Sequence, residues 1–209
     1  MSAVNIAVLV SGGGTNLQAL LDSQRVGTLK SGRITLVVSN NADAYALRRA
    51  EAAGVAAKAI VRAVFPSQEA FEDALLDALD EAGAELVILA GFLSILSRRF
   101  TERYPRRILN IHPSLIPSFC GKGFYGLRVH EAALAYGVKV TGATVHFVNE
   151  VPDGGEILLQ KAVDVLPGDT PETLQRRVME QAEWILLPQA AELVSQNIMK
   201  EKETNDRSS

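Results

Sequence analysis

The stretch Ile6-Ala7-Val8-Leu9-Val10-Ser11-Gly12-Gly13-Gly14-Thr15-Asn16 decides the architecture that the sequence predicts. Its first five residues are apolar and rich in β-branched side chains, which is typical of a strand buried on both faces. Three glycines then allow a sharp turn, and residues 16–26 carry a helical pattern. A buried strand that passes through a glycine turn into a helix indicates the first unit of an α/β fold.

The same alternation continues outward from this stretch. We expect strands at 33–39, 55–61, 85–90 and 108–111 and helices at 16–26, 44–53 and 97–103. A further helix is expected between Ser67, its N-cap residue, and a point near Gly83. Two β-branched runs at 138–148 and 157–165 flank a turn-rich loop and predict an antiparallel hairpin. Thr170-Pro171-Glu172 has the chemistry of a helix start and opens a long final helix.

These elements predict an α/β fold: a single doubly wound, mostly parallel, Rossmann-like sheet with a C-terminal antiparallel hairpin and a long C-terminal helix. We expect one domain over residues 1–199, because no repeat or linker interrupts the pattern. Residues 200–209 are polar and charged and predict a disordered tail.

Composition excludes several classes of function. The 209 residues carry a formal net charge of −3, so no overall basic field attracts nucleic acid or an anionic membrane. Cys120 is the one cysteine, which rules out an intrachain disulfide and favours a reducing, cytoplasmic setting. The three histidines lack zinc-site spacing, so we expect no metal. The N-terminus shows neither a signal peptide nor a membrane span. A monomer or a homodimer fits equally well.

The glycine loop at Ser11-Gly12-Gly13-Gly14-Thr15-Asn16 suits a phosphate, because a helix N-terminus offers free N–H groups and partial positive charge. It departs from the dinucleotide fingerprint, since Leu17 occupies the third glycine position, and no Gly-Lys-Ser/Thr follows for a Walker A loop. The sequence therefore favours a phosphorylated small molecule over NAD or ATP. A flexible strand-to-helix turn is the alternative.

The segment Asn110-Ile111-His112-Pro113 contains the candidate catalytic side chains. Asn110 and His112 are two residues apart, so in a strand their side chains point to the same side. An amide donor beside a proton carrier suits a reaction in which an oxyanion forms and a proton moves. Asp153 lies in the hairpin loop. Each residue alone also has a plain interpretation: a strand end for Asn110, a buried core histidine for His112 and a turn residue for Asp153. His146, on an alternating strand, is more typical of a packed core.

Taken in order, the motifs resemble those of the phosphoribosylglycinamide formyltransferases, a family of folate-dependent formyltransferases. The resemblance extends from about Ile6 to Pro188 and rests on residues 11–18, 39–40, 89–92, 110–117, 144–148 and 153–155. It implies transfer of a formyl group from 10-formyltetrahydrofolate, as cosubstrate, to the amine of glycinamide ribonucleotide in purine synthesis. The central motif alone is shared with other folate-dependent formyltransferases.

The resemblance also implies the site. Asn110, His112 and Asp153 match the catalytic residues, with Asp153 expected to raise the pKa of the His112 imidazolium. The ribonucleotide is expected on Gly14, Thr15, Asn16 and Glu183, where one inserted residue earlier in the final helix keeps Glu183 in register. The expected folate contacts are Gln68, Leu93, Ser94, Ile95, Leu96, Asn110, Asn149, Glu150, Val151, Pro152 and Asp153.

Two positions depart from many relatives, which carry arginine where Gln68 and Ser94 stand. Lys122 and Arg128 are the candidates to replace that charge. They lie in a glycine-containing loop whose composition fits a mobile cover over the site and a plain connecting loop equally well. The rival functions are a 10-formyltetrahydrofolate hydrolase, formyl transfer to another amine, and a non-catalytic sensor of a phosphorylated ligand. The tRNA formyltransferases share the central motif but add a nucleic-acid-binding domain.

Overall fold

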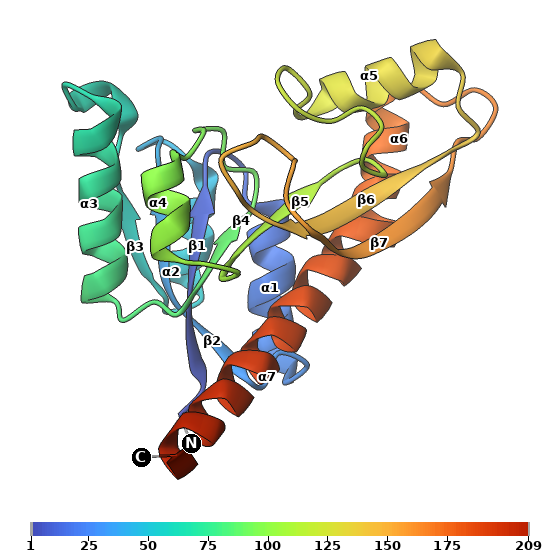
Figure 1. The fold of residues 1–209 in the computed structure, drawn as a ribbon. Helices are drawn as coiled ribbons and strands as arrows, with labels where there is room; N and C mark the ends of the chain where they lie inside the picture. Colours follow the sequence, from blue (N-terminus) through green and yellow to red (C-terminus); the bar gives the residue numbers. More distant parts are fainter. Residues whose placement is uncertain (1, 209) are drawn as a thin grey trace.

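The computed structural model describes residues 2–208, and its centre is one seven-stranded sheet of order β3-β2-β1-β4-β5-β6-β7 (Figure 1). The strands are β1 (Val4–Val10), β2 (Gly32–Ser39), β3 (Ala56–Ala59), β4 (Leu86–Leu89), β5 (Ile108–His112), β6 (Val140–Phe147) and β7 (Ile157–Asp164). The first five pair in parallel, whereas β6 pairs antiparallel with both β5 and β7. The predicted doubly wound sheet with a C-terminal hairpin is confirmed.

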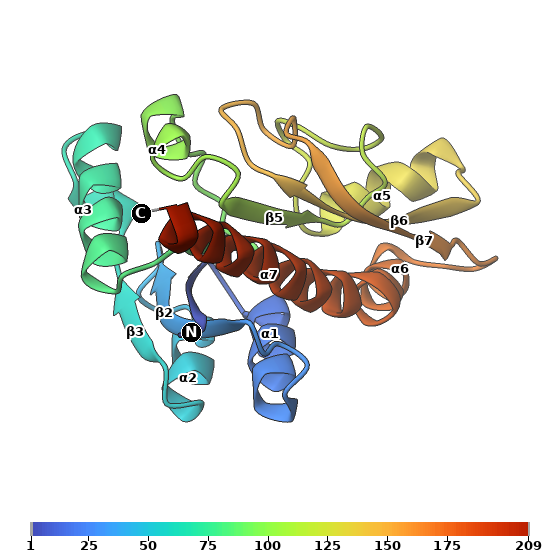
Figure 2. The same cartoon turned by 60° about the horizontal axis from the view of Figure 1, so that its bottom comes forward.

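Helices cover both faces of the sheet. They are α1 (Thr15–Val26), α2 (Tyr45–Ala52), α3 (Gln68–Glu81), α4 (Arg98–Arg103), α5 (Leu127–Tyr136), α6 (Pro171–Val178) and α7 (Trp184–Ser208), with short η1 (Arg62–Val64) and π-helical η2 (Met179–Glu183). Strand β1 feeds both cores by alternation: Ile6 and Val8 pack on the side of α1 and α7, and Ala7 and Leu9 pack on the side of α3. Figure 2 shows α7 running across the sheet beside α1.

Helix ends follow the predicted capping chemistry. The Ser67 hydroxyl accepts a hydrogen bond from the amide of Ala70 at the start of α3. Thr170 and Thr173 form a reciprocal capping box at the start of α6. Helix α5 begins at Leu127, directly after Gly126. No helix within residues 2–208 combines the length and apolarity needed to cross a bilayer.

The C-terminal segment differs from its prediction. Helix α7 continues through Ser208, where the sequence predicts a disordered tail over residues 200–209; Ser209 lies outside the described residues. Two ion pairs join this end to the sheet layer: Arg107 contacts Glu201 at 3.0 Å, and Lys202 contacts Glu85 at 2.5 Å. Composition could not reveal these contacts, because their partners are distant in sequence.

Candidate active site

Asn110 and His112 lie at the carboxyl end of β5, where the parallel part of the sheet meets the antiparallel hairpin. Their side chains share one side of the strand, as the two-residue spacing predicts, because both reach Asp153. Ligands of open α/β sheets bind at the carboxyl ends of strands, so this is the edge where a site is expected.

Asp153 is the centre of the cluster and comes from the loop between β6 and β7. Its Oδ1 lies 3.3 Å from Asn110 Nδ2 and 3.6 Å from His146 Nε2. Its Oδ2 accepts the amide of Gly121 at 2.8 Å and lies 3.4 Å from His112 Nδ1. The loop packs directly on β6, since a Cβ at Gly155 would lie 1.6 Å from the Phe147 carbonyl oxygen. Four groups therefore fix one carboxylate, whose own backbone has a φ of 56°.

The protonation of this cluster follows from its burial and its partners. Burial would raise the pKa of the Asp153 carboxyl, but His146, His112 and the Gly121 amide together outweigh it and lower the pKa. Burial lowers the pKa of His112, and Asp153 and the Phe119 carbonyl oppose this only in part. Asp153 therefore acts in the expected direction, and burial, the larger effect, keeps the net pKa of His112 below its ordinary value.

Hydrogen bonding fixes the orientation of His112. Its Nε2 lies 2.9 Å from the Phe119 carbonyl oxygen, which can only accept, so Nε2 carries a hydrogen. Its Nδ1 faces Asp153, and that contact is favourable when Nδ1 is protonated as well. In its imidazolium form, His112 can therefore donate one hydrogen bond to the Asp153 carboxylate and one to the Phe119 carbonyl oxygen.

His146 belongs to the cluster, although its pattern alone was more typical of core packing. It lies opposite Asn110 across the β5–β6 pair, and its Nε2 is 3.1 Å from Asn110 Nδ2. Its Nδ1 donates to the Phe147 carbonyl oxygen at 2.9 Å, so in the neutral ring Nε2 is free to accept from Asn110. The signal that could have identified His146 is the antiparallel register.

The glycine loop joins β1 to α1. Gly14 has a φ of 73°, and a Cβ there would lie 2.6 Å from the Cβ of Ala46, so glycine is required on both counts. The amides of residues 13–16 donate to no other group within residues 2–208. They lie at the N-terminus of α1, which is the arrangement that binds anions.

Glu183 reaches this loop from the end of η2. It is buried, and its Oε2 accepts a hydrogen bond from Asn16 Nδ2 at 2.6 Å. Burial raises the pKa of Glu183 to about 7, against the smaller effect of Asn16. The π-helical turn Met179–Glu183 holds one more residue than an α-helical turn, which is consistent with the one-residue insertion that the family resemblance implies.

A cavity of about 210 Å³ brings these groups together. Its lining includes the glycine loop, Ile111 and Pro113 from the end of β5, and the side chains of His130 and Glu183. His130 is fully buried, and neither ring nitrogen has a partner within residues 2–208. Burial, with a smaller effect of the His112 charge, lowers the pKa of His130 to about 4, so this ring is neutral at pH 7. In the sequence His130 lies at a predicted helix start near the glycine-containing loop, where it could face the site, but it was not assigned a role.

A second cavity of about 270 Å³ opens on the other side of β5. It brings together ten of the eleven expected folate positions: Leu93, Ser94, Ile95, Leu96, Asn110, Asn149, Glu150, Val151, Pro152 and Asp153. Residues 121–125 form a further wall, so the glycine-containing loop does lie at the site. The structure therefore gathers segments that are distant in sequence around Asn110.

Gln68 is the expected folate position that does not line this cavity. Its Nε2 donates to Glu72 Oε1 at 2.9 Å and to the Ile95 carbonyl oxygen at 3.0 Å. Its Oε1 accepts from Arg62 Nε at 3.1 Å. The amide is therefore occupied on both sides, and its visible role is to hold the segment around Ile95 against α3.

Lys122 and Arg128, the two candidate cations for the folate site, lie in different surroundings. Lys122 lines the second cavity, whereas Arg128 lies over the ring of Tyr125 at 4.9 Å and does not line it. Ser94 accepts a hydrogen bond from Asn40 Nδ2 at 2.8 Å. Among the residues whose side chains the structure describes, no group of three acids, histidines or cysteines is arranged to hold a metal ion.

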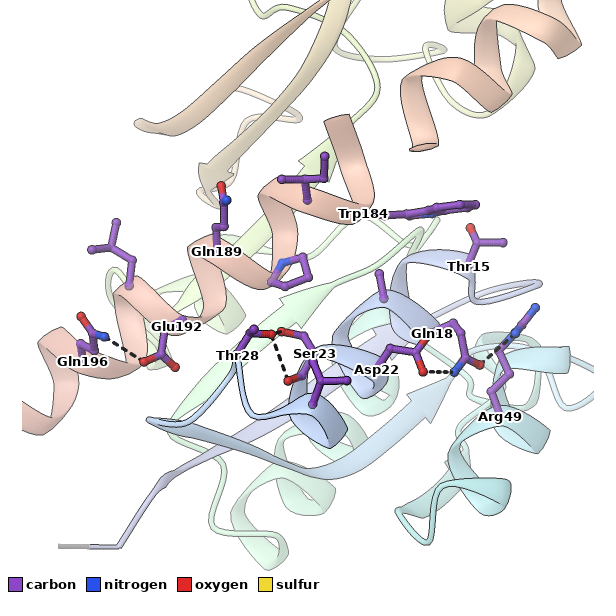
Figure 3. Close-up of a pocket in the computed structure, with 15 residues that line it drawn as sticks. Thr15, Gln18, Asp22, Ser23, Thr28, Arg49, Trp184, Gln189, Glu192 and Gln196 are labelled. Carbon is purple, nitrogen blue, oxygen red and sulfur yellow. Dashed lines mark hydrogen bonds between the residues drawn. The ribbon is translucent and has the colours of Figure 1, made fainter. Parts of the chain in front are cut away.

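The largest cavity, about 780 Å³, lies between α1 and α7 and is separate from the Asn110 cluster (Figure 3). It touches the glycine loop through Thr15, with Trp184 and Arg49 nearby. Its other walls include Val26, Ile185 and Leu193, and none of the Asn110 cluster residues reaches it.

Comparisons with known proteins identify one family. Residues 4–190 match the family model described as formyl transferase. The chain is 42% identical over 178 residues to the phosphoribosylglycinamide formyltransferase of Escherichia coli strain K12, covering 85% of this chain and 81% of that protein. It is 47% identical over 192 residues to the trifunctional purine biosynthetic protein adenosine-3 of Gallus gallus. That match covers 92% of this chain but 18% of the trifunctional protein, so the chain spans under a fifth of its length.

Solved structures show the same fold. The crystal structure of glycinamide ribonucleotide transformylase 1 from Symbiobacterium toebii superposes with a TM-score of 0.87 at 46% identity, covering 93% of this chain and 89% of that one. The phosphoribosylglycinamide formyltransferase of Brucella melitensis superposes with a TM-score of 0.85 at 43% identity, covering 93% of this chain and 96% of that one.

Proposed function

The chain belongs to the formyl transferase family, and we propose that it transfers the formyl group of 10-formyltetrahydrofolate to the amine of 5'-phosphoribosylglycinamide, a step of purine synthesis. One observation carries the proposal: the two cavities are lined by neighbouring residues of the same strand end, that of β5. Ile111 and Pro113 line the cavity of the glycine loop, and Asn110 lines the cavity of the expected folate segments. A phosphorylated acceptor and a formyl donor bound on the two sides would meet at Asn110 and His112.

The acceptor's phosphate binds at the start of α1. Gly14, Thr15 and Asn16 offer amides that lack internal partners, and the helix dipole adds partial positive charge. Glu183 lies at the same cavity and accepts hydrogen bonds, which suits the hydroxyl groups of a ribose. The phosphate and the sugar thereby fix the direction in which the glycinamide amine points.

The folate donor lies against the second cavity. Leu93, Ile95 and Val151 are largely exposed apolar side chains at its mouth, which suit the flat rings of a folate. Lys122 is the cation that lines this cavity, and in our proposal it meets the carboxylates of the folate tail. Gln68 acts on the folate indirectly, through the position of Ile95.

The chemistry follows from the cluster around Asp153. The amine nitrogen attacks the formyl carbon, a C–N bond forms, and the carbonyl electron pair becomes an oxyanion. Asn110 donates an N–H to that oxygen in exchange for its contact with Asp153 or His146, and the imidazolium of His112 donates a second hydrogen bond. The C–N bond to the folate then breaks and returns the carbonyl. His112 delivers a proton to the leaving folate nitrogen, while the proton lost by the amine restores the imidazolium.

Asp153 keeps His112 competent for this cycle. Its Oδ2 faces Nδ1 at 3.4 Å and stabilises the positive ring in a buried place where burial alone favours the neutral form. The Phe119 carbonyl oxygen, 2.9 Å from Nε2, occupies the position that a substrate oxygen takes in this proposal. Substrate binding therefore requires an exchange of acceptors at Nε2.

The same cluster would also suit a 10-formyltetrahydrofolate hydrolase, with water as the acceptor, or transfer to another amine. The glycine loop favours a phosphorylated acceptor over water, because a hydrolase has no need of a second anion site. A sensor of phosphorylated ligands would explain the loop but leaves Asn110, His112 and Asp153 without a role. A tRNA acceptor would need a basic binding surface, which the net charge of −3 does not favour.

One experiment separates these functions. The purified protein is mixed with 10-formyltetrahydrofolate, with and without the ribonucleotide, and tetrahydrofolate, formate and formylated product are measured. The proposal expects tetrahydrofolate and formylated ribonucleotide in equal amounts, and only when the acceptor is present. Formate without acceptor indicates a hydrolase, product with a different amine indicates another acceptor, and no turnover with ligand binding indicates a sensor.

We also propose a cytoplasmic enzyme that works without a metal, as a monomer or a homodimer. The single cysteine supports a reducing compartment, and neither proton transfer nor oxyanion stabilisation in the cluster needs a cation. Turnover is expected to survive dialysis against a chelator, and light scattering during gel filtration measures the mass of the assembly. Loss of turnover that zinc or magnesium restores would refute the metal-free proposal.

A further inference from the structure

The three glycine carbonyls of the loop all have partners. The Gly12 oxygen accepts the amide of Ala46 at 3.1 Å, and the Gly14 oxygen accepts the amide of Gln18 at 2.9 Å. The middle one, at Gly13, accepts Nε of Arg49 at 2.8 Å. Two of these three donors are backbone groups of α1 and α2, and the third is a side chain.

These contacts determine where the amides point. A peptide unit is planar and trans, so its C=O and the next N–H point in opposite directions. A fixed Gly13 oxygen therefore fixes the amide of Gly14, one of the proposed phosphate donors. Arg49 draws that oxygen towards α2 and away from the anion, which a carbonyl oxygen would repel.

Arg49 is itself held on several sides. Its Nη1 donates to Gln18 Oε1 at 2.9 Å, and Gln18 in turn donates to Asp22 Oδ1 at 3.3 Å on the next turn of α1 (Figure 3). Its guanidinium lies over the ring of Tyr45 at 4.9 Å. The side chain thus bridges α2, the loop and α1, and it is preorganised before any ligand binds.

The backbone of the loop leaves little freedom beside this bridge. A Cβ at Gly14 would lie 2.9 Å from the Cα of Ala46 and 3.5 Å from Cδ of Arg49, so α2 packs directly on the loop. The close approach of Ala46 leaves the Gly14 peptide little room to reorient, so its direction depends on the hydrogen bond from Arg49 to the Gly13 oxygen.

We infer that Arg49 is a positioning residue for the phosphate of the ribonucleotide: it orients the Gly14 amide and places a positive charge behind the loop. The inference rests on the proposed function for the identity of the ligand. It assigns Arg49 no contact with the reacting atoms, so it concerns binding of one substrate and not the chemical step.

The test compares Arg49→Gln with Arg48→Gln in steady-state kinetics with both substrates. Arg48 lies on the same helix, is exposed, and its loss changes the net charge equally. For Arg49→Gln we expect the KM for the ribonucleotide to rise about tenfold, as for the loss of one aligning charge-assisted hydrogen bond, with kcat and the KM for formyl folate unchanged. For Arg48→Gln we expect all three constants to stay within about twofold of the parent.

Arg49→Lys provides a second test in case Arg49→Gln does not fold. A lysine keeps the charge and can still reach Gly13, but it cannot hold Gln18 at the same time, so a smaller rise in the ribonucleotide KM is expected. A ribonucleotide KM for Arg49→Gln or Arg49→Lys equal to that of Arg48→Gln overturns the inference. An equal rise in both KM values, with a lower Tm, also overturns it, because that is the effect of a general structural role.

A binding measurement separates this inference from the proposed function. Ribose 5-phosphate is expected to raise the Tm of the parent and of Arg48→Gln, and to raise that of Arg49→Gln much less. If the parent forms no formylated product but shows this pattern, the role of Arg49 stands and the proposed function fails. If product forms and ribose 5-phosphate shifts the Tm of all three proteins equally, the role of Arg49 fails and the proposed function stands.

Discussion

The Asp153 carboxylate lies 3.4 Å from Nδ1 of His112, and the two side chains are only 12% and 5% exposed. At this distance in a poorly solvated place, the carboxylate is the main group that favours a positive imidazole, because burial and His146 both lower the pKa of His112. The negative charge of Asp153 therefore favours the protonated form of His112.

Asp153→Asn keeps the shape of the side chain and removes this charge. We expect kcat to fall by about 10²- to 10⁴-fold, the usual contribution of acid–base catalysis, with little change in either KM. The matched control is Asp77→Asn, an exposed carboxylate on α3, which should leave kcat unchanged. Turnover of Asp153→Asn within a few-fold of the parent would remove Asp153 from the mechanism.

The dependence of kcat on pH reports the same pair. The imidazolium of His112 is present below its pKa, which lies under the ordinary value of 6.5, so activity is lost as the pH rises through it. Activity also falls at low pH, because the attacking amine is then protonated. We therefore expect a bell-shaped profile. In Asp153→Asn the alkaline limb should move to lower pH, and a flat profile in the parent would contradict the assignment of His112.

His146→Phe tests the residue that the sequence did not single out. The change removes the acceptor that orients Asn110 and one of the contacts of Asp153, while keeping a ring in the buried position. We expect a fall in kcat of roughly 10- to 100-fold, as for groups that orient others. Because His146 lowers the pKa of His112, the alkaline limb should also move to higher pH. A lower Tm with an unchanged profile would indicate packing alone.

Glu183 predicts a dependence of stability on pH. Its pKa rises from 4.5 to about 7 on folding, so the folded state favours the protonated form. The stability that this provides is complete below about pH 4.5 and is lost as the pH rises through 7, by roughly 3 kcal/mol in total. Glu183→Gln cannot ionise, so its stability relative to the parent should increase between pH 5 and pH 8.

Urea unfolding at several pH values measures this difference. Glu180→Gln, which removes an exposed acid from the same π-helical turn, is the control for the loss of one carboxylate there. A constant difference between Glu183→Gln and the parent would show that Glu183 is not a buried titrating acid.

The sequence predicted what depends on local pattern. Apolar runs gave β1 and β5, and the two-residue period placed Asn110 and His112 on one side of a strand. Asp153 was assigned through the family resemblance, because a Pro-Asp-Gly-Gly turn alone says nothing about the β5 residues that it meets. His146 was passed over for a related reason: its role comes from the antiparallel register opposite Asn110.

Other differences come from contacts that no local pattern encodes. Gln68 was expected at the folate, but Arg62, Glu72 and the Ile95 carbonyl oxygen occupy its amide. The helical end of α7 forms ion pairs with Glu85 and with Arg107, which precede β4 and β5. The extra residue before Glu183 was recognised in the sequence, yet its structural form, a π-helical turn, depends on both neighbouring helices keeping their buried faces.

Deletion of Gln181, an exposed residue of η2, tests that last relationship. A regular α-helix through this turn would rotate one side by about 100° and shift it by about 1.5 Å relative to the other. Leu174 of α6 and Leu187 of α7 are both fully buried and cannot both keep their faces after such a rotation. We expect a clearly lower Tm and a higher KM for the ribonucleotide, since Glu183 would leave Asn16. Gln181→Ala keeps the length and should match the parent in both measurements. A deletion variant with the Tm and KM of the parent would show that the π-helical turn has no part in placing Glu183.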